Sequence, residues 1–117
     1  MKKRIFVYDV SKGFSSFIKH YYDEKMEIDI CTKKKNLTNY KMSTYDFCFF
    51  SVNDIDDFLF LRNTDFANDL FFINAPNKII NEKIYNLNFN NAVLFDFDTS
   101  KKNIIEKINF IFKLKNV

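Results

Sequence analysis

Short apolar runs alternate with amphipathic or polar stretches along the whole chain. The apolar runs begin near residues 4, 26, 46, 69 and 92, and residues at helical spacing follow most of them. Strands that are covered on both faces of a parallel sheet read as apolar runs, and the helices that cover them are amphipathic. The pattern therefore predicts one α/β domain over residues 1–117, with a parallel sheet and helices on both of its faces.

The stretch from Tyr45 to Asp54 is expected to lie in the centre of the sheet. Its apolar run, Phe47 to Phe50, stops at Ser51 and a polar turn. Residues 26–32 instead alternate between apolar and polar side chains, which is typical of a half-exposed strand at an edge. With the apolar first, third and fourth strands in the middle, the five-stranded sheet is expected to have the flavodoxin-like order 2-1-3-4-5.

The early part of the chain predicts three helices. The first is expected over residues 11–24 with Ser11 as its N-cap. Residues 36–42 form a short, weak helix at best, and the third helix begins at Asn53 or Asp54. The residues of the third helix that are expected to face the core are Ile55, Phe58, Leu59 and the stem of Arg62.

Two further helices follow the fourth and fifth strands. Pro76 suits the start of the fourth helix, and Thr99 or Ser100 suits the cap of the last one. The residues expected to face the core are Ile79, Ile80, Ile84 and Leu87 in the fourth helix, and Ile104, Ile105, Ile108, Ile111 and Phe112 in the last.

Composition and charge exclude several classes of protein. A net charge of +3 is small for a nucleic-acid-binding domain, so no nucleic-acid partner is expected. No apolar run has the length of a membrane span or follows the pattern of a secretory signal. We therefore expect a cytoplasmic protein, without membrane contact, in which Cys31 and Cys48 are reduced. The sole histidine, His20, is expected on the surface, and neither a metal site nor a cofactor is expected.

The charges are unevenly distributed along the chain. Residues 53–69 hold five aspartates against the single base Arg62, and residues 99–117 hold five lysines against the single acid Glu106. One part of the surface should be acidic and another basic. Two interpretations remain open, namely solvated helix faces or the docking of a charged partner.

Polar residues stand at the carboxyl ends of four predicted strands: Asp9, Ser51, Asn74 and Asp96. Ligands of parallel α/β sheets bind at these strand ends. Two acids and two small polar groups in one cleft are chemically able to bind a cation or a polar metabolite, as in a small enzyme or a ligand-binding protein. The other interpretation is that these residues only complete turns and cap helices.

Four segments carry a resemblance to a known family: RIFVYDVS, DFCFFSV, LFFINAP and VLFDFDTS. Over its whole length the chain resembles a response-regulator receiver domain. In that family the first strand ends in paired acids that hold magnesium, the third in a phosphorylated aspartate, the fourth in Thr or Ser, and the fifth in a Lys-Pro pair. The resemblance places Asp9 and Val10 at the acids, Ser51 at the phosphoacceptor, Asn74 at the hydroxyl position, and Asp96 and Phe97 at the Lys-Pro pair.

Only Asp9 keeps the residue type that the family's chemistry needs. A serine without an adjacent base does not replace a carboxylate nucleophile, so Ser51 is not expected to accept phosphate. One remaining acid is a poor magnesium site. Asp96 would repel the phosphoryl group that a lysine neutralises, and Val93, near the position of the family's switching aromatic residue, has no ring. The resemblance therefore implies a degenerate member, a pseudo-receiver.

A second motif gives a different interpretation of the fifth strand. AVLFDFDTS is similar to the signature of haloacid-dehalogenase phosphatases, with Asp96 as the nucleophile, Asp98 as the acid/base and Ser100 in place of the threonine. In that family the motif opens the chain and a long domain follows it, whereas here it stands near the C-terminal end. Asp98 and Ser100 are more simply explained as the turn and cap of the last helix.

The leading expectation is a protein that is not an enzyme and that binds a protein partner in bacterial signalling or regulation. The alternative is a small enzyme or ligand-binding protein that uses the acids at the strand ends. Receivers often bind partners or form homodimers through the fourth helix, fifth strand and fifth helix. On this chain that face is expected to be basic and to carry Lys83, Tyr85, Lys101, Lys102 and Glu106.

Overall fold

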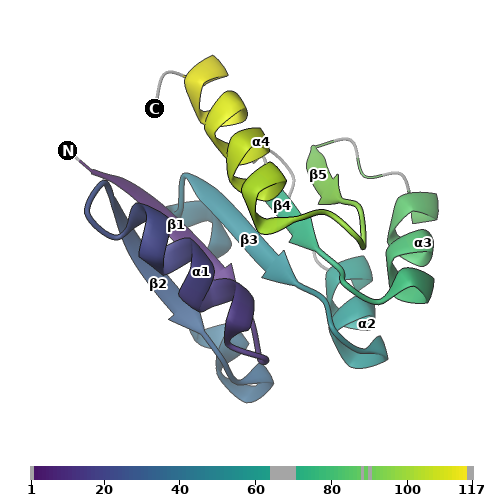
Figure 1. Ribbon diagram of the computed structural model, residues 1–117. Coiled ribbons are helices and arrows are strands. Elements are labelled where there is room, and N and C mark those ends of the chain that lie inside the picture. The colour runs from purple at the N-terminus through teal and green to yellow at the C-terminus, as the bar shows by residue number, and fades with distance from the viewer. Residues whose placement is uncertain (1, 64–70, 88, 90, 116–117) are drawn as a thin grey trace.

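Five parallel strands run through the molecule in the order β2-β1-β3-β4-β5, which confirms the predicted topology (Figure 1). The computed structural model describes residues 2–63, 71–87, 89 and 91–115. The strands are β1 (Lys3–Tyr8), β2 (Met26–Cys31), β3 (Phe47–Ser51), β4 (Phe71–Asn74) and β5 (Ala92–Phe95). The helices are α1 (Gly13–Tyr22), α2 (Ile55–Asn63), α3 (Lys78–Leu87) and α4 (Lys101–Leu114), with the 3₁₀ helices η1 (Lys34–Asn39) and η2 (Met42–Thr44).

Helices cover both faces of the sheet (Figure 1). On the first face, α1 and α4 pack their apolar sides against alternate residues of the strands, such as Val7 and Phe49. On the second face, α2, α3 and η1 pack against the residues between them, such as Phe6 and Ile73. Because successive residues of a strand point to opposite faces, each central strand contributes to both halves of the core.

Stacked phenylalanine rings cross the first face from strand to strand. The rings of Phe49 and Phe72 lie 4.5 Å apart at 11°, and those of Phe72 and Phe95 lie 6.1 Å apart at 14°. All three side chains are 0–1% exposed. The central position predicted for β3 therefore coincides with a fully buried part of the core.

Two helices are rotated relative to the predicted orientation. Ile55 of α2 and Ile79 of α3 were expected in the core, but they are 52% and 66% exposed. Polar residues, Asp57 and Asn81, are buried in these helices instead. Each has hydrogen-bond partners that exist only inside the fold, so the burial of a polar group overrides the apolar pattern. Leu59 and Leu87 were also expected in the core, but each is 37% exposed.

Other local predictions are corrected or confirmed. Helix α1 is preceded by Lys12 as its N-cap residue, not by Ser11. Residues 36–42 contain 3₁₀ helix rather than α-helix. Ser100 caps α4 as predicted, because its side chain accepts a hydrogen bond from the Asn103 N–H. Two of the acids predicted for the acidic segment, Asp65 and Asp69, and the predicted strand residue Leu70 lie outside the described residues.

The cysteines and the histidine lie at positions that the sequence pattern predicts. Cys31 and Cys48 are both buried and lie on β2 and β3, with β1 between these strands. His20 is exposed, as expected. Among the residues that the structure describes, no helix has the length and apolar character needed to cross a membrane.

Lys12 has a left-handed backbone conformation, with φ of 70°. A side chain with a β-carbon is strained in this region, whereas glycine is not. Lys12→Gly is therefore expected to raise the free energy of unfolding by about 0.5–1 kcal/mol, measured by urea denaturation. In the control, Lys19→Gly inside α1, stability should fall by about 1 kcal/mol. A loss of stability in Lys12→Gly would contradict the assignment of strain to this residue.

Candidate functional site

The carboxyl ends of the strands lie side by side in register. Tyr8 pairs with Phe50, Ser51 with Asn74, and Asn74 with Phe95. The residues Tyr8, Phe50 and Ile73 belong to the core half on the second face. By the alternation of strands, their neighbours Asp9, Ser51 and Asn74 point toward the first face, that of α1 and α4. The structure thus places three of the four predicted site residues on one side of adjacent strand ends.

Asp9 is completely buried, and its carboxylate closes the loop before α1. One oxygen, Oδ1, accepts hydrogen bonds from the Ser11 N–H at 3.1 Å and the Ser11 hydroxyl at 2.5 Å. The other, Oδ2, accepts from the Ser15 N–H in the first turn of α1 at 2.9 Å. An anion is stabilised at a helix N-terminus by unpaired N–H groups and by the helix dipole. The buried Asp9 carboxylate therefore stabilises the N-terminal end of α1.

Ser51 is 1% exposed and lies between two side-chain amides. Its Oγ is 3.3 Å from Asn74 Nδ2 and 3.4 Å from Asn53 Nδ2, and both amides donate to it. Among the described residues, no acidic or imidazole group accepts a hydrogen bond from Ser51. A serine needs such a base to act as a nucleophile, so this arrangement suits a buried polar contact between β3 and β4 better than it suits catalysis.

Asp96 is separated from the other three predicted site residues. It is exposed just beyond β5 and lines a groove on the second face together with Tyr85 and Asn86 of α3. The sequence spacing alone placed Asp96 with Asp9, Ser51 and Asn74. The structure places it on the side of α3, because Leu94 faces the second face and Phe95 the first, and Asp96 continues this alternation.

A buried pair that the sequence did not indicate joins β1 to the start of α2. The Tyr8 hydroxyl donates to Asp57 Oδ1 at 2.7 Å, and the Asn53 N–H donates to Asp57 Oδ2 at 3.0 Å. Burial of the phenol, and then its hydrogen bond to Asp57, raise the pKa of Tyr8 well above its ordinary value. Tyr8 and Asp57 are 49 residues apart in the chain, so no periodic signal could have paired them.

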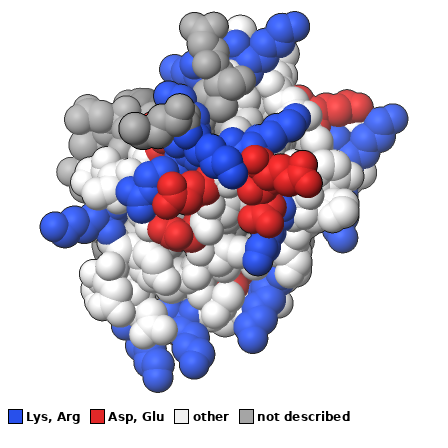
Figure 2. Space-filling model, turned by 90° about the vertical axis from the view of Figure 1, so that its left-hand side faces the viewer, with Lys and Arg blue, Asp and Glu red and all other residues white. Residues whose placement is uncertain are grey.

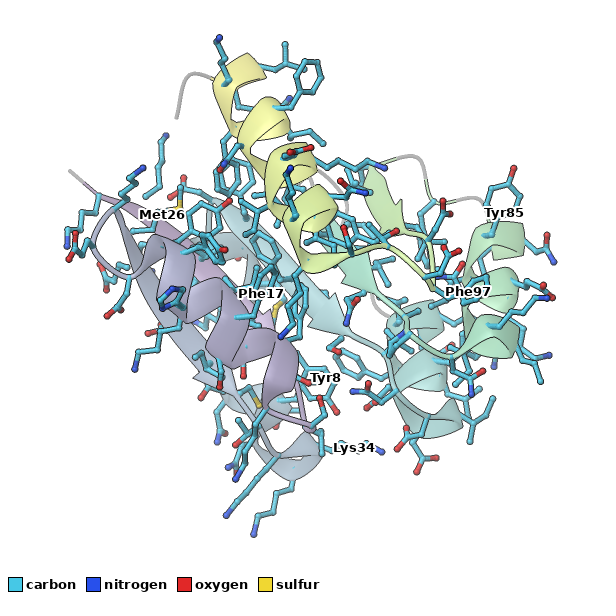
Figure 3. The ribbon with its side chains drawn as sticks, in the orientation of Figure 1. Tyr8, Phe17, Met26, Lys34, Tyr85 and Phe97 are labelled. Atoms are coloured by element: carbon cyan, nitrogen blue, oxygen red, sulfur yellow. The ribbon has the colours of Figure 1, made fainter. Side chains whose placement is uncertain are left out.

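Lys34 reaches from η1 to the acidic start of α2 (Figure 3). Its Nζ lies 3.0 Å from Asp54, 3.6 Å from Asp56 and 3.7 Å from Asp57. The hydrogen bond to Asp54 raises the pKa of the Lys34 ammonium. The segment between β2 and β3 is thereby tied to α2, and part of the charge of the predicted acidic region is neutralised within the protein.

The ionisation of Asp54 makes a testable contribution to stability. Asp54 Oδ1 accepts the Asp57 N–H at 2.9 Å, and this bond, followed by Lys34, holds the pKa of Asp54 below its ordinary value of 3.8. A carboxyl whose pKa is lowered by folding stabilises the fold above its unfolded pKa and loses that effect as the pH falls through its folded pKa. Wild type should therefore lose more stability between about pH 6 and about pH 3 than Asp54→Asn does.

Urea denaturation of both proteins at each pH measures this difference. Asparagine is a good N-cap, so the substitution removes the charge while it keeps a side-chain acceptor. Asp23→Asn, which changes an exposed acid at the end of α1, serves as the control. Equal acid sensitivity of wild type and Asp54→Asn would contradict the role of the Asp54 carboxylate.

The predicted basic partner face is divided in the structure. Lys83 and Tyr85 are exposed on α3, and Tyr85 is 75% exposed and points away from the protein (Figure 3). Lys101 instead lies toward α1, with its Nζ 5.7 Å from the ring of Phe17. Lys102 is exposed near the start of α4. These residues belong to two neighbouring surfaces, because the first turn of α4 packs beside α1.

Acidic residues, not basic ones, line the hollows between α3 and β5. A groove of about 520 Å³ includes Asp96, and an adjoining hollow of about 490 Å³ includes Glu82, Asp96 and Asp98. The exposed ring of Phe97 lies at the same end, with Lys78 Nζ 5.8 Å from it (Figure 3). Within the described part of the chain, no group of three or more His, Cys, Asp or Glu side chains is arranged to hold a metal ion.

The opposite edge of the sheet, at β2, carries paired charges. Arg4 of the neighbouring strand β1 lies 3.4 Å from Asp29 and 3.8 Å from Glu27, and both of these acids are on β2. Figure 2 shows this side of the molecule, with acidic side chains near its middle and lysine or arginine side chains around them. Charged side chains along an edge strand disfavour pairing with another strand.

Comparison of the sequence finds no match among protein-family models or among curated proteins. Comparison of the structure finds response regulators. DrrB of Thermotoga maritima, an OmpR/PhoB homologue, matches with a TM-score of 0.73 and 8% identity over 98% of this chain and 54% of DrrB, so this chain spans about half of DrrB. The chemotaxis protein CheY4 of Vibrio cholerae matches with a TM-score of 0.67 and 10% identity, over 94% of this chain and 98% of CheY4.

A CheY-like receiver domain protein of Methanospirillum hungatei also matches, with a TM-score of 0.64 and 13% identity over 99% of this chain and 98% of that protein. Such low identities carry information about the fold rather than about individual residues. Strand order, parallel pairing and coverage of both faces all agree with these structures. The chain has the flavodoxin-like fold found in CheY-like receiver domains of response regulators.

Proposed function

We propose that this chain is a receiver-like signalling module that does not accept phosphate, is not an enzyme, and acts by binding a protein partner in the bacterial cytoplasm. The observation that supports this proposal most is Ser51. It stands at the end of β3, where the resemblance to receivers places the phosphorylated aspartate, and it is buried between the amides of Asn53 and Asn74. A serine without a base is a poor nucleophile for phosphoryl transfer.

The neighbouring strand ends support the same proposal. The carboxylate of Asp9, which would hold magnesium in a receiver, accepts three hydrogen bonds from Ser11 and Ser15. Binding a cation would require this carboxylate to give up some of those bonds. Asp96, at the position of the family's lysine, is an exposed acid on the side of α3, so it supplies no positive charge that could neutralise a phosphoryl group at Ser51.

Phosphorylation from a small donor tests the loss of phosphoacceptor activity. The protein is incubated with acetyl phosphate and magnesium and its intact mass is measured, beside a receiver domain that retains its aspartate as the positive control. We expect no added phosphoryl group on this chain while the control gains one. A stable gain that maps to Ser51 or Asp9, and that disappears in Ser51→Ala or Asp9→Asn, would overturn the proposal.

Partner binding is tested separately from phosphorylation. Lys83, Tyr85 and Lys102 are exposed near β5, and Lys101 lies beside them toward α1. The doubly reversed variant Lys101→Glu/Lys102→Glu should lose a partner that wild type captures from the native cell. Lys33→Glu/Lys35→Glu, reversed at exposed positions near η1, is the matched control and should keep it. Equal capture by both variants would contradict a partner surface at Lys101 and Lys102. A homodimer through this face is tested by measuring the mass of the protein in solution.

A further inference from the structure

The outer edge of β5 is the second edge of the sheet, and it differs from the β2 edge. Its sequence, Ala92 to Phe95, is entirely apolar. The side chains of Ala92, Val93 and Leu94 are half-exposed, although each packs against the core on one side. Natural proteins usually protect an edge strand with charges, prolines or bulges, as the paired charges do at β2. The strand β5 itself carries none of these.

The register of β4 and β5 shows which backbone groups point outward. Phe71 pairs with Ala92, and the Phe71 N–H donates to the Asn91 carbonyl at 3.1 Å. In a parallel ladder, a residue such as Phe71 bonds to the residues before and after its partner, which here are Asn91 and Val93. Val93 therefore bonds toward β4, whereas the N–H and C=O groups of Ala92 and Leu94 face the outer edge. Within the described part of the chain, no other residue forms a hydrogen bond to these outward groups.

Hydrogen bonds from α3 fix the backbone at the carboxyl end of β5, which favours the pairing of a further strand with it. Asn81 of α3 is 7% exposed, and its Nδ2 donates to the Phe95 carbonyl at 2.8 Å and to the Ala75 carbonyl at 3.1 Å. One amide thus joins α3 to the carboxyl ends of β4 and β5. A strand with a fixed backbone loses little conformational entropy when another strand pairs with it.

A groove on the second face continues from this edge. It has a volume of about 520 Å³, and its apolar walls are Ile84, Phe89, Ala92 and Leu94. Its rim includes the exposed carboxylate of Asp96, and the adjoining hollow adds Glu82 and Asp98. A strand added beside β5 would direct every second side chain toward this groove. The acidic rim is complementary to a lysine or arginine on such a strand.

We propose that an extended segment of a partner protein adds to β5 as a sixth strand of the five-stranded sheet. Its backbone bonds to the outward N–H and C=O groups of Ala92 and Leu94. Its apolar side chains, at every second position, enter the groove, and a lysine or arginine lies beside Asp96. This inference rests on the proposed function, because it states how one segment of the partner binds and what the chemistry of that segment is. The segment contacts β5 and Asp96, whereas the surface at Lys101 and Lys102 would contact another part of the same partner.

A library of random peptides, selected against the whole protein, tests the inference. We expect the recovered peptides to alternate apolar residues with polar ones and to contain lysine or arginine. Their binding should slow amide hydrogen exchange at Ala92 and Leu94. Recovery of no binders, or of binders that protect only other parts of the chain, would overturn the proposal.

Two pairs of variants make the test specific. Ala92→Pro removes an outward N–H that is not used by the β4 ladder, whereas Ala92→Ser keeps it. Ala92→Pro should bind the selected peptides about tenfold more weakly than Ala92→Ser, which corresponds to the loss of about one backbone hydrogen bond. Equal binding by these two variants would refute strand addition while it leaves the proposed docking function standing.

The second pair tests the charge and does not depend on a proline. Selection against Asp96→Lys should recover peptides with glutamate or aspartate in place of lysine or arginine, whereas selection against the control Asp23→Lys, at an exposed acid at the end of α1, should recover the same basic peptides as wild type. An unchanged peptide composition for Asp96→Lys would refute the role of Asp96. If the protein alone forms a dimer that Ala92→Pro abolishes, the occupant of the edge is a second copy and the proposed partner segment is wrong.

Discussion

Replacing Asp9 with alanine is expected to lower the free energy of unfolding by about 3 kcal/mol. The carboxylate is 0% exposed and accepts three hydrogen bonds, from the Ser11 N–H and hydroxyl and from the Ser15 N–H. Alanine would leave these donors without their acceptor beside a helix N-terminus, where a negative charge is stabilising. Urea denaturation of wild type and Asp9→Ala measures the difference.

Two further variants control this result. Asp9→Asn keeps one acceptor oxygen at the same place, so it should lose about half as much stability. Asp23→Ala removes an exposed acid at the other end of α1 and should change stability by no more than about 0.5 kcal/mol.

The sign of the effect decides between two roles of Asp9. Residues that are kept for ligand binding or catalysis often reduce stability, so their removal often stabilises the protein. A gain of stability in Asp9→Ala would therefore contradict a structural role for this carboxylate. It would favour the alternative in which the acids at the strand ends bind a cation or a polar ligand.

Phe49→Ala is expected to have the largest effect on the fold, a loss of about 3–5 kcal/mol. Phe49 is 0% exposed in the central strand β3, and its ring stacks on Phe72 at 4.5 Å and lies 6.4 Å from Phe14 of α1. Alanine would leave a cavity between three secondary-structure elements that cannot all move to fill it. A loss of this size is a large fraction of the stability of a small domain.

The same substitution at an exposed position is the matched control. Phe110 on α4 is 63% exposed, so Phe110→Ala should change the free energy of unfolding by no more than about 0.5 kcal/mol. Both variants are measured by urea denaturation followed by circular dichroism. Similar effects of Phe49→Ala and Phe110→Ala would contradict the placement of β3 at the centre of the core.

Parts of the candidate site could be predicted from the sequence. Asp9, Ser51 and Asn74 stand directly after apolar runs or at their ends, and parallel strands bring such ends to one edge of the sheet. The roles of Asp57 and Lys34 could not be predicted in this way. Asp57 is buried only because Tyr8, from another strand, donates to it, and Lys34 reaches acids that follow it by 20 or more residues.

The sequence by itself determined the class of fold, the order of the strands and the position of β2 at an edge. These properties depend on the alternation of apolar and polar residues within each short segment, which is a local signal. The tertiary structure alone decided the rotation of α2 and α3 and the separation of Asp96 from the other strand-end residues. The rotation depends on which polar groups meet across the fold, because a buried donor or acceptor needs a partner wherever the chain brings one. The separation of Asp96 depends on which residues of β5 face each side of the folded sheet.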